Sequence, residues 1–352
     1  MNHSAYRRTF TNRTSQHGLS LIELMISITI GLLILSALAT LFVNQSKTRT
    51  ELDKSNRLID NGRYALEVLS ENLRLAGFYG ERALTALPVI SDPCTSDLST
   101  PNLTDLRDAL GLHVAGYDAT AASGVGATIG SPPCGLTTPP LTTADLKDGS
   151  DILVLRRADT TPIPAASAVN GTHYIQLSNC KYDAATSVID TTATNFVLRQ
   201  HDCTSTSTLP AANVRRFFVQ TYYISPNNIA GDGIPTLKLK ELDPAGSGVF
   251  IITPLVEGIE YLQVDYGIDG DNDGVADSYA TTCATAVCWS NVVSVKLWAI
   301  ARNIETTSGY TNTNTYTLGL AGTFGPFNDS YKRHVYTQVV RLINPSSRRE
   351  RP

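Results

Sequence analysis

Residues 18–24, Gly-Leu-Ser-Leu-Ile-Glu-Leu, open an apolar run that continues to Val43. Between Leu19 and Val43 the run contains one charged residue, Glu23, and no proline. A helix rises about 1.5 Å per residue, so this run is long enough to cross a hydrocarbon core of roughly 30 Å. Residues 1–18 contain three arginines and no acid. The sequence therefore predicts a membrane helix behind a basic leader.

Gly18 lies before the apolar helix, and not after it as the cleavage site of a secretory signal would. In a secretory signal the small-residue cleavage site follows the apolar region, whereas here the small residue precedes it. A cut after Gly18 would remove the leader and leave the helix on the mature chain. A carboxylate inside a membrane helix costs about 2.5–3.5 kcal/mol at the bilayer centre, so Glu23 is a functional candidate. Its expected partner is the new amine of Leu19; the alternative is an uncleaved chain with Glu23 at the interface.

The segment from Gly18 to Ser27 resembles the prepilin signal of type IV pilins and of type II secretion pseudopilins. The resemblance implies that a prepilin peptidase cuts between Gly18 and Leu19 and that the new N-terminus is methylated. It also implies that Glu23 pairs with the N-terminal amine of a neighbouring subunit. Leu19 is a departure, because the family most often has phenylalanine there.

The helix is expected to continue beyond the membrane. Residues 44–77 contain no proline, and a leucine or isoleucine recurs every seven residues at Leu52, Ile59, Leu66 and Leu73. Such an amphipathic stripe predicts a face that packs on a sheet, with Gly77 as the C-terminal cap. Leu19 to Ala76 is then one helix. The segment from Asp60 to Phe78 resembles the PilW family of minor pilins, which implies a role in type IV pilus assembly.

Composition and cysteine usage limit the classes of partner. The formal net charge is −4 and becomes −7 without the leader arginines, so no nucleic-acid partner is expected. Six cysteines follow the membrane helix, and the positive-inside rule places them in the oxidising periplasm. Six cysteines allow fifteen pairings. The simplest pairs sequence neighbours: Cys94–Cys134, Cys180–Cys203 and Cys283–Cys288. A zinc site is the weaker alternative, because no CxxC or nearby histidine pair is present.

The rest of the chain predicts a β-rich head. Residues 80–148 contain repeated prolines and are expected to form loops. Eight short apolar or alternating runs follow, at 151–156, 173–177, 216–224, 236–240, 249–252, 259–266, 291–301 and 335–343. The predicted class is α+β and pilin-like, with a long helix packed on a mainly antiparallel sheet. The domains are leader 1–18, membrane and assembly helix 19–43, amphipathic helix 44–77 and head 78–352. The arginines at 348, 349 and 351 are expected to form a frayed tail.

One motif has metal-ligand spacing. Carboxylates at Asp269, Asp271, Asp273 and Asp277, with glycine at the sixth position, match a calcium loop in which the Val275 carbonyl also points inward. Position 12 is alanine rather than the glutamate of an EF-hand, which leaves one ligand missing. The sequence predicts Ca²⁺ binding, with an affinity of about 10⁻⁴–10⁻³ M as in extracellular sites. The alternative is a solvated acidic hairpin turn.

No catalytic motif is present: the chain has no GxSxG, HExxH or Walker loop, and its six histidines are scattered. We therefore expect neither an enzyme nor a small-molecule substrate. The leading hypothesis is a PilW-like minor pilin of the inner membrane that enters the pilus and contacts other minor pilins, the major pilin and prepilin peptidase. The alternatives are a minor pseudopilin of type II secretion and a calcium-dependent adhesin at the pilus tip.

Overall fold

The computed structural model describes residue 18 and residues 20–81, 106–119, 141–203, 211–242 and 250–350. Predictions for the leader residues 1–17, for Leu19, and for the Cys94–Cys134 pair lie outside these residues. The chain divides into two compact units, residues 1–53 and 54–352, which we describe separately.

Helix α1 (Leu21–Leu75) confirms the predicted long helix to within two residues at either end. It is followed by Gly77, whose φ of 71° lies in the left-handed region that only glycine adopts readily, as predicted for a C-terminal cap. In the first unit, the large apolar side chains between Leu21 and Val43 are exposed. An 18-residue window there has a mean hydropathy of 2.5, so the helix is apolar and long enough to cross a membrane.

The buried face of α1 in the second unit differs from the predicted stripe. Leu66, Leu69 and Leu73 are buried as expected, but Ile59 is exposed, as is Leu52, which belongs to the first unit. A strict seven-residue repeat drifts about 20° per heptad around a straight helix, so a long stripe cannot face one flat surface. The residues that line the observed face recur every three or four positions: Leu58, Gly62, Ala65, Leu66, Leu69, Ser70 and Leu73.

Gly62 is buried on this face because the ring of Tyr336 lies against it. A β-carbon at residue 62 would lie 2.1 Å from Tyr336 Cε2. The Tyr336 hydroxyl donates a hydrogen bond to the Leu58 carbonyl, 3.3 Å away, which holds the ring across the helix. Glycine therefore allows close packing of helix and sheet at this point.

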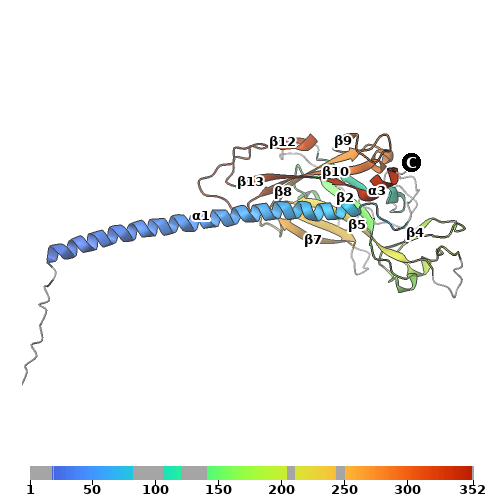
Figure 1. Ribbon diagram of the computed structural model, residues 1–352, viewed down its shortest axis with the longest axis horizontal. Helices are drawn as coiled ribbons and strands as arrows, with labels where there is room; N and C mark the ends of the chain where they lie inside the picture. Colours follow the sequence, from blue (N-terminus) through green and yellow to red (C-terminus); the bar gives the residue numbers. More distant parts are fainter. Residues whose placement is uncertain are drawn as a thin grey trace, which may run out of the picture. The chain divides into compact units, whose positions relative to one another are not determined.

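The head contains short helices and antiparallel strands (Figure 1). The helices are α2 (Ala286–Ser290) and α3 (Ile343–Arg349), with 3₁₀ turns at Asp108–Gly111, Thr143–Asp145, Ala165–Ser167, Ala193–Asn195 and Gly319–Ala321. The strands are β1 (Val114–Tyr117), β2 (Ile152–Ala158), β3 (Tyr174–Leu177), β4 (Ser187–Asp190), β5 (Val214–Ser225), β6 (Thr236–Leu242), β7 (Phe250–Glu257), β8 (Ile259–Ile268), β9 (Ser278–Ala280), β10 (Val292–Arg302), β11 (Tyr316–Leu318), β12 (Gly322–Phe324) and β13 (Arg333–Arg341).

These strands form two main sheets and a small hairpin. The larger sheet has the order β1-β2-β5-β3-β4, and β6 pairs with β5 and with β7. The second sheet has the order β13-β10-β8-β9, and β11 pairs with β12. Every pairing is antiparallel, as expected for the α+β class. The buried face of α1 shares one apolar core with residues of both main sheets.

All eight predicted strand segments correspond to observed strands, but the prediction for residues 80–148 was wrong in part. Strand β1 and a 3₁₀ turn lie within the described residues 106–119. The strand Val114–Tyr117 is only four residues long, and its cross-strand partners in β2 are distant in sequence, so local periodicity could not reveal it. The strands β4, β9, β11 and β12 were also missed, because each is only three or four residues long.

The two sheets are joined through residues 150–151 at the start of β2. The Asp151 carboxylate accepts hydrogen bonds from the backbone N–H of Ala119 and of Val264, each 2.9 Å away. Ser150 Oγ accepts a hydrogen bond from the backbone N–H of Leu262. Since Leu262 and Val264 belong to β8, these two residues link the first sheet to the second.

Candidate functional site

The N-terminal signal begins with an exposed glycine followed by a capped helix. Gly18 is exposed, and a β-carbon there would meet no atom within 4 Å. The backbone N–H of Ser20 donates to Glu23 Oε2 (3.0 Å), and the backbone N–H of Glu23 donates to Ser20 Oγ (3.3 Å). This reciprocal arrangement is a capping box, and it places the Glu23 carboxylate at the N-terminus of α1.

The role of Ser20 was missed by the sequence analysis, although a serine three residues before a glutamate is the usual signal for a capping box. Glu23 is the acidic residue of the first turn of α1. Helix N-termini favour negative charge, so this position stabilises the ionised carboxylate.

The acidic motif forms the hairpin loop between β8 and β9. Oxygen atoms of Asp269, Asp271 and Asp273 lie within 4.8 Å of one another. Asp269 is buried, whereas the other two carboxylates are exposed. Among the described residues, this is the group of Asp, Glu, His or Cys side chains whose ligand atoms lie close enough together to hold a metal ion. The flanking elements are strands, which agrees with the prediction that this is not an EF-hand.

The loop is shaped by bonds from its own backbone to its carboxylates. Asp269 accepts from the N–H of Asn272 (2.6 Å) and of Gly274 (3.0 Å). Asp277 accepts from the N–H of Gly270 (2.7 Å). Burial of Asp269 opposes ionisation, but these backbone donors and a nearby guanidinium outweigh it and hold the pKa of Asp269 below its ordinary value.

The nearby guanidinium belongs to Arg349, and here the prediction of a frayed C-terminal tail was wrong for Arg348 and Arg349. Arg349 Nη1 lies 3.4 Å from Asp269 Oδ2 and donates to Asn272 Oδ1 at 2.7 Å. Its other nitrogen, Nη2, donates to the Asn291 side chain at 2.6 Å. Arg351 lies outside the described residues. Arg349 and Asp269 are 80 positions apart in the chain, so no local sequence pattern could predict their contact.

The donor set fits a cation in part. Asp269, Asp271 and Asp273 supply converging carboxylate oxygens of the kind that Ca²⁺ prefers. Asp277 is not part of that cluster, because its carboxylate is directed to the Gly270 N–H. Val275 is exposed. Arg349 places a positive charge beside Asp269, so part of the charge of this cluster is already balanced within the protein.

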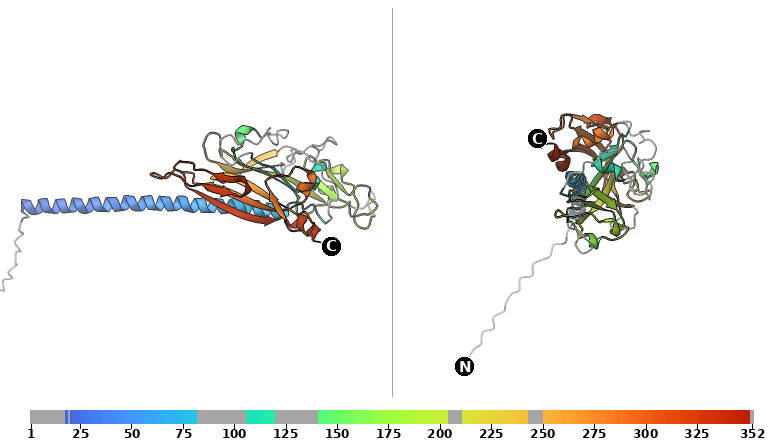
Figure 2. Two further views of the ribbon diagram at one scale, coloured as in Figure 1. Left: turned by 90° about the horizontal axis from the view of Figure 1, so that it is seen from above. Right: turned by 90° about the vertical axis from the view of Figure 1, so that its right-hand side faces the viewer.

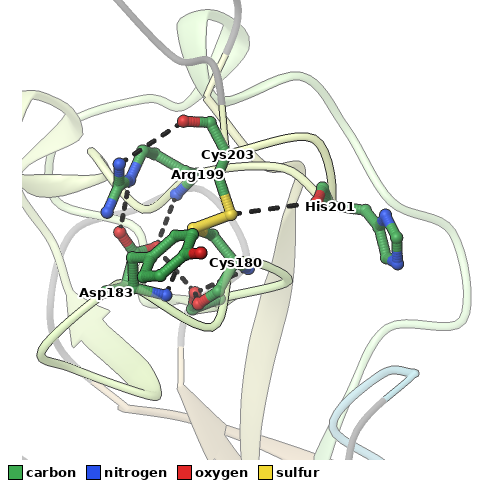
Figure 3. The surroundings of a disulfide bond; sticks show 7 residues. Cys180, Asp183, Arg199, His201 and Cys203 are labelled. Atoms are coloured by element: carbon green, nitrogen blue, oxygen red, sulfur yellow. Dashed lines mark hydrogen bonds and ion pairs between the residues drawn. A yellow bond between two sulfur atoms is a disulfide. The ribbon is translucent and has the colours of Figure 1, made fainter.

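Two of the three predicted disulfides fall within the described residues, and both are formed: Cys180–Cys203 and Cys283–Cys288. Figure 3 shows the first, with the Asp183–Arg199 ion pair (2.6 Å) beside it. The His201 side chain points away from the sulfur atoms (Figure 3). Because Cys203 is bonded to Cys180, it is not a free nucleophile next to His201.

Comparison with known proteins agrees with this architecture. Residues 13–39 match the prokaryotic N-terminal methylation motif. Residues 221–344 match the family described as type IV pilus-assembly protein W (PilW). This second match runs from β5 to the start of α3, and not over Asp60–Phe78, where the sequence analysis had placed the resemblance. No curated protein and no solved structure matches the chain.

The two matched families are pilin and pilus-assembly proteins rather than enzymes. Membership of a type IV pilus system implies other pilins as partners, and the methylation motif with the apolar N-terminal helix indicates an anchor in the inner membrane. The chain therefore carries a PilW family match over residues 221–344 and a prepilin-type methylation motif near its N-terminus, and together they support a type IV pilus-related minor pilin.

Proposed function

We propose that this minor pilin helps to initiate type IV pilus assembly as part of a priming or tip complex. The observation that carries the proposal is the segment Leu21–Val43 of α1, whose large apolar side chains are exposed and whose single charged residue is Glu23. In a bundle of such helices, apolar faces pack together, and a lone buried carboxylate needs a cationic partner. The N-terminal amine that a neighbouring subunit acquires on cleavage is such a partner.

The proposed route has three steps. The positive leader orients the chain with its head in the periplasm, prepilin peptidase cuts between Gly18 and Leu19, and the new amine is methylated. The helix then leaves the inner membrane and joins other minor pilins and the major pilin. The capping box gives Glu23 an internal partner before this transfer, so that pairing with a neighbour is an exchange of one partner for another.

A strain that produces the Glu23→Ala protein tests the pairing. We expect fewer surface pili, less twitching and loss of this protein from sheared fibres, while cleavage of the leader still occurs. Glu67→Ala is the matched control, because Glu67 is an exposed acid on the same helix. Normal incorporation of the Glu23 variant into fibres would rule out the pairing role.

The PilW match favours the pilus over a type II secretion pseudopilin, which shares the N-terminal signal. Deletion strains separate these roles and also test the tip-adhesin hypothesis. Loss of pili supports an assembly role, whereas loss of protein secretion with normal pili supports the pseudopilin. Piliated cells that fail to adhere would assign the chain to adhesion instead.

The loop at 269–277 is the proposed calcium site, supported by the convergence of three aspartates. Bound Ca²⁺ would balance their charge and make the loop rigid for contact with a subunit or a surface. Titration of the full chain in detergent with Ca²⁺ should release heat, and Ca²⁺ should raise the melting temperature. Asp271→Ala should abolish both effects and Glu67→Ala neither. If the unaltered protein gives no calcium heat and Asp271→Ala melts unchanged, the loop is only an acidic turn.

A further inference from the structure

The C-terminal helix α3 lies against the end of α1. Both views in Figure 2 place the red α3, next to the chain's C-terminus, beside the end of the blue helix. The last four carbonyls of any helix lack partners within it. Here Asn344 Nδ2 lies 3.5 Å from the Arg74 carbonyl, which is one of these four, and donates to the Ala76 carbonyl (3.2 Å) just beyond the helix; Arg348 Nη2 donates to the next carbonyl, that of Gly77 (2.9 Å). A cation is also favoured at this negative end of the helix dipole.

The opposite side of α3 holds the acidic loop. Arg349 bonds to Asp269 and Asn272 from one nitrogen, and Ser346 Oγ donates to the Gly274 carbonyl at 2.7 Å. The fit is tight, because a β-carbon at Gly274 would lie 2.8 Å from the Ser346 carbonyl. Arg349 also reaches the end of α2 through the Ser290 carbonyl (3.1 Å).

The neighbouring arginines 348 and 349 therefore point to different structures, one to the end of α1 and one to the acidic loop. From this arrangement we propose that α3 is a strap that couples the conformation of the loop 269–277 to the docking of α1 on the head. A change that loosens or orders the loop 269–277 then alters the stability of the contact between the last turns of α1 and the head. The PilW match ends at residue 344, so the family match does not include these two arginines.

The coupling has a structural basis that does not require a bound ion. Ser346 is fully buried, and Leu342, which precedes α3, is buried in the core that also contains Leu69 and Leu73 of α1. Helix α3 is only seven residues long and is held on one side by Asn344 and Arg348 and on the other by Ser346 and Arg349, so it should move as one piece. Loss of the contacts between α3 and the loop 269–277 should therefore weaken the contacts between α3 and the end of α1.

Hydrogen–deuterium exchange on the full chain in detergent tests the strap. Arg349→Gln removes the contacts with the loop and leaves Asn344 and Arg348 in place. We expect exchange to become about tenfold faster or more, the effect of losing charged hydrogen bonds, in α3 and also in residues 66–76 of α1. Arg57→Gln is the control, because Arg57 is an exposed arginine of α1 far along the helix from this end.

Faster exchange confined to α3 and the loop, or no difference from Arg57→Gln, would overturn the coupling. If Arg349→Gln unfolds the whole head, β8 and β10 will also exchange rapidly. Ser346→Ala, which removes one hydrogen bond from the same contact, then replaces it and is judged by the same two outcomes. The test is independent of pilus assembly, so its failure leaves the proposed function unaffected.

Discussion

Replacing Gly62 by alanine should destabilise the head, although alanine is the better helix former. The added β-carbon would lie 2.1–2.6 Å from three ring atoms of Tyr336. The ring cannot move away freely, because its hydroxyl donates to the Leu58 carbonyl and the ring makes a T-shaped contact with that of His334 at a centroid distance of 4.8 Å. The substitution therefore has two opposing effects: alanine favours the helical conformation, but its β-carbon disrupts the packing against Tyr336.

The opposing free energies have known sizes. Alanine in place of glycine inside a helix is worth about 1 kcal/mol. Overpacking a tight contact costs about 1–3 kcal/mol, and loss of the Tyr336 hydrogen bond adds about 1 kcal/mol. The expected net effect is a loss of about 1–3 kcal/mol. In a Tyr336→Ala background the clash is absent, and Gly62→Ala should then stabilise the protein by up to about 1 kcal/mol.

Urea unfolding of the full chain in detergent measures both values. The two tryptophans of the chain, Trp289 and Trp298, lie in α2 and β10, so their fluorescence reports on the head. The double-mutant cycle isolates the contact between residues 62 and 336. If Gly62→Ala changes the free energy of unfolding equally in both backgrounds, within about 0.5 kcal/mol, the close packing does not exist.

Three further predictions concern the head. Burial lowers the pKa of His113 to about 4 from an unfolded value near 6.5, so stability should fall as the pH drops from about 6.5 to 4, by about 3 kcal/mol in total. His113→Gln should flatten this part of the curve of melting temperature against pH, and an unchanged slope would contradict the assignment. The Cys180–Cys203 disulfide spans 23 positions, and the Cys283–Cys288 disulfide spans 5. Because a longer closed loop restricts the unfolded chain more, alanine replacement of the first pair should lower the free energy of unfolding by about 3 kcal/mol, and replacement of the second pair by about 2 kcal/mol. Calorimetry that showed the reverse order would argue against this loop-entropy account. Glu260→Gln removes a buried carboxylate that pairs with two arginines at 3.3 and 2.6 Å, and it should cost about 3–5 kcal/mol in denaturant unfolding, whereas a loss below about 1 kcal/mol would show that the pairing is dispensable.

The sequence predicted those features whose residues are close together in the chain. The apolar run, the downstream helix and its glycine cap depend on neighbours a few residues away, as does the Cys283–Cys288 pair. The aspartates of the acidic loop lie within nine positions, so their spacing alone predicted that they converge. The Asp277 side chain stays outside the cluster because a backbone N–H competes for it, which spacing does not reveal.

Features that depend on distant residues were not predictable in this way. The stripe on α1 was misassigned at Leu52 and Ile59, because the face that is buried depends on where the sheet meets the helix. The close contact at Gly62 follows only from the position of Tyr336, which is 274 positions away in the chain. Strand β1 is too short to show a period and is stabilised by pairing with β2.

The stretch from Gly18 to Val43 shows what local sequence can determine. Its length, its single charge and the preceding arginines are local properties, so the sequence alone determined that the chain has a prepilin-like signal and an apolar helix. The C-terminal arginines illustrate the opposite case. Read in isolation they resemble a frayed tail, but in the fold Arg348 reaches the end of α1 and Arg349 the acidic loop. Only the tertiary structure could decide this, because a buried or partly buried charge finds its partner by position in space and not by position in the chain.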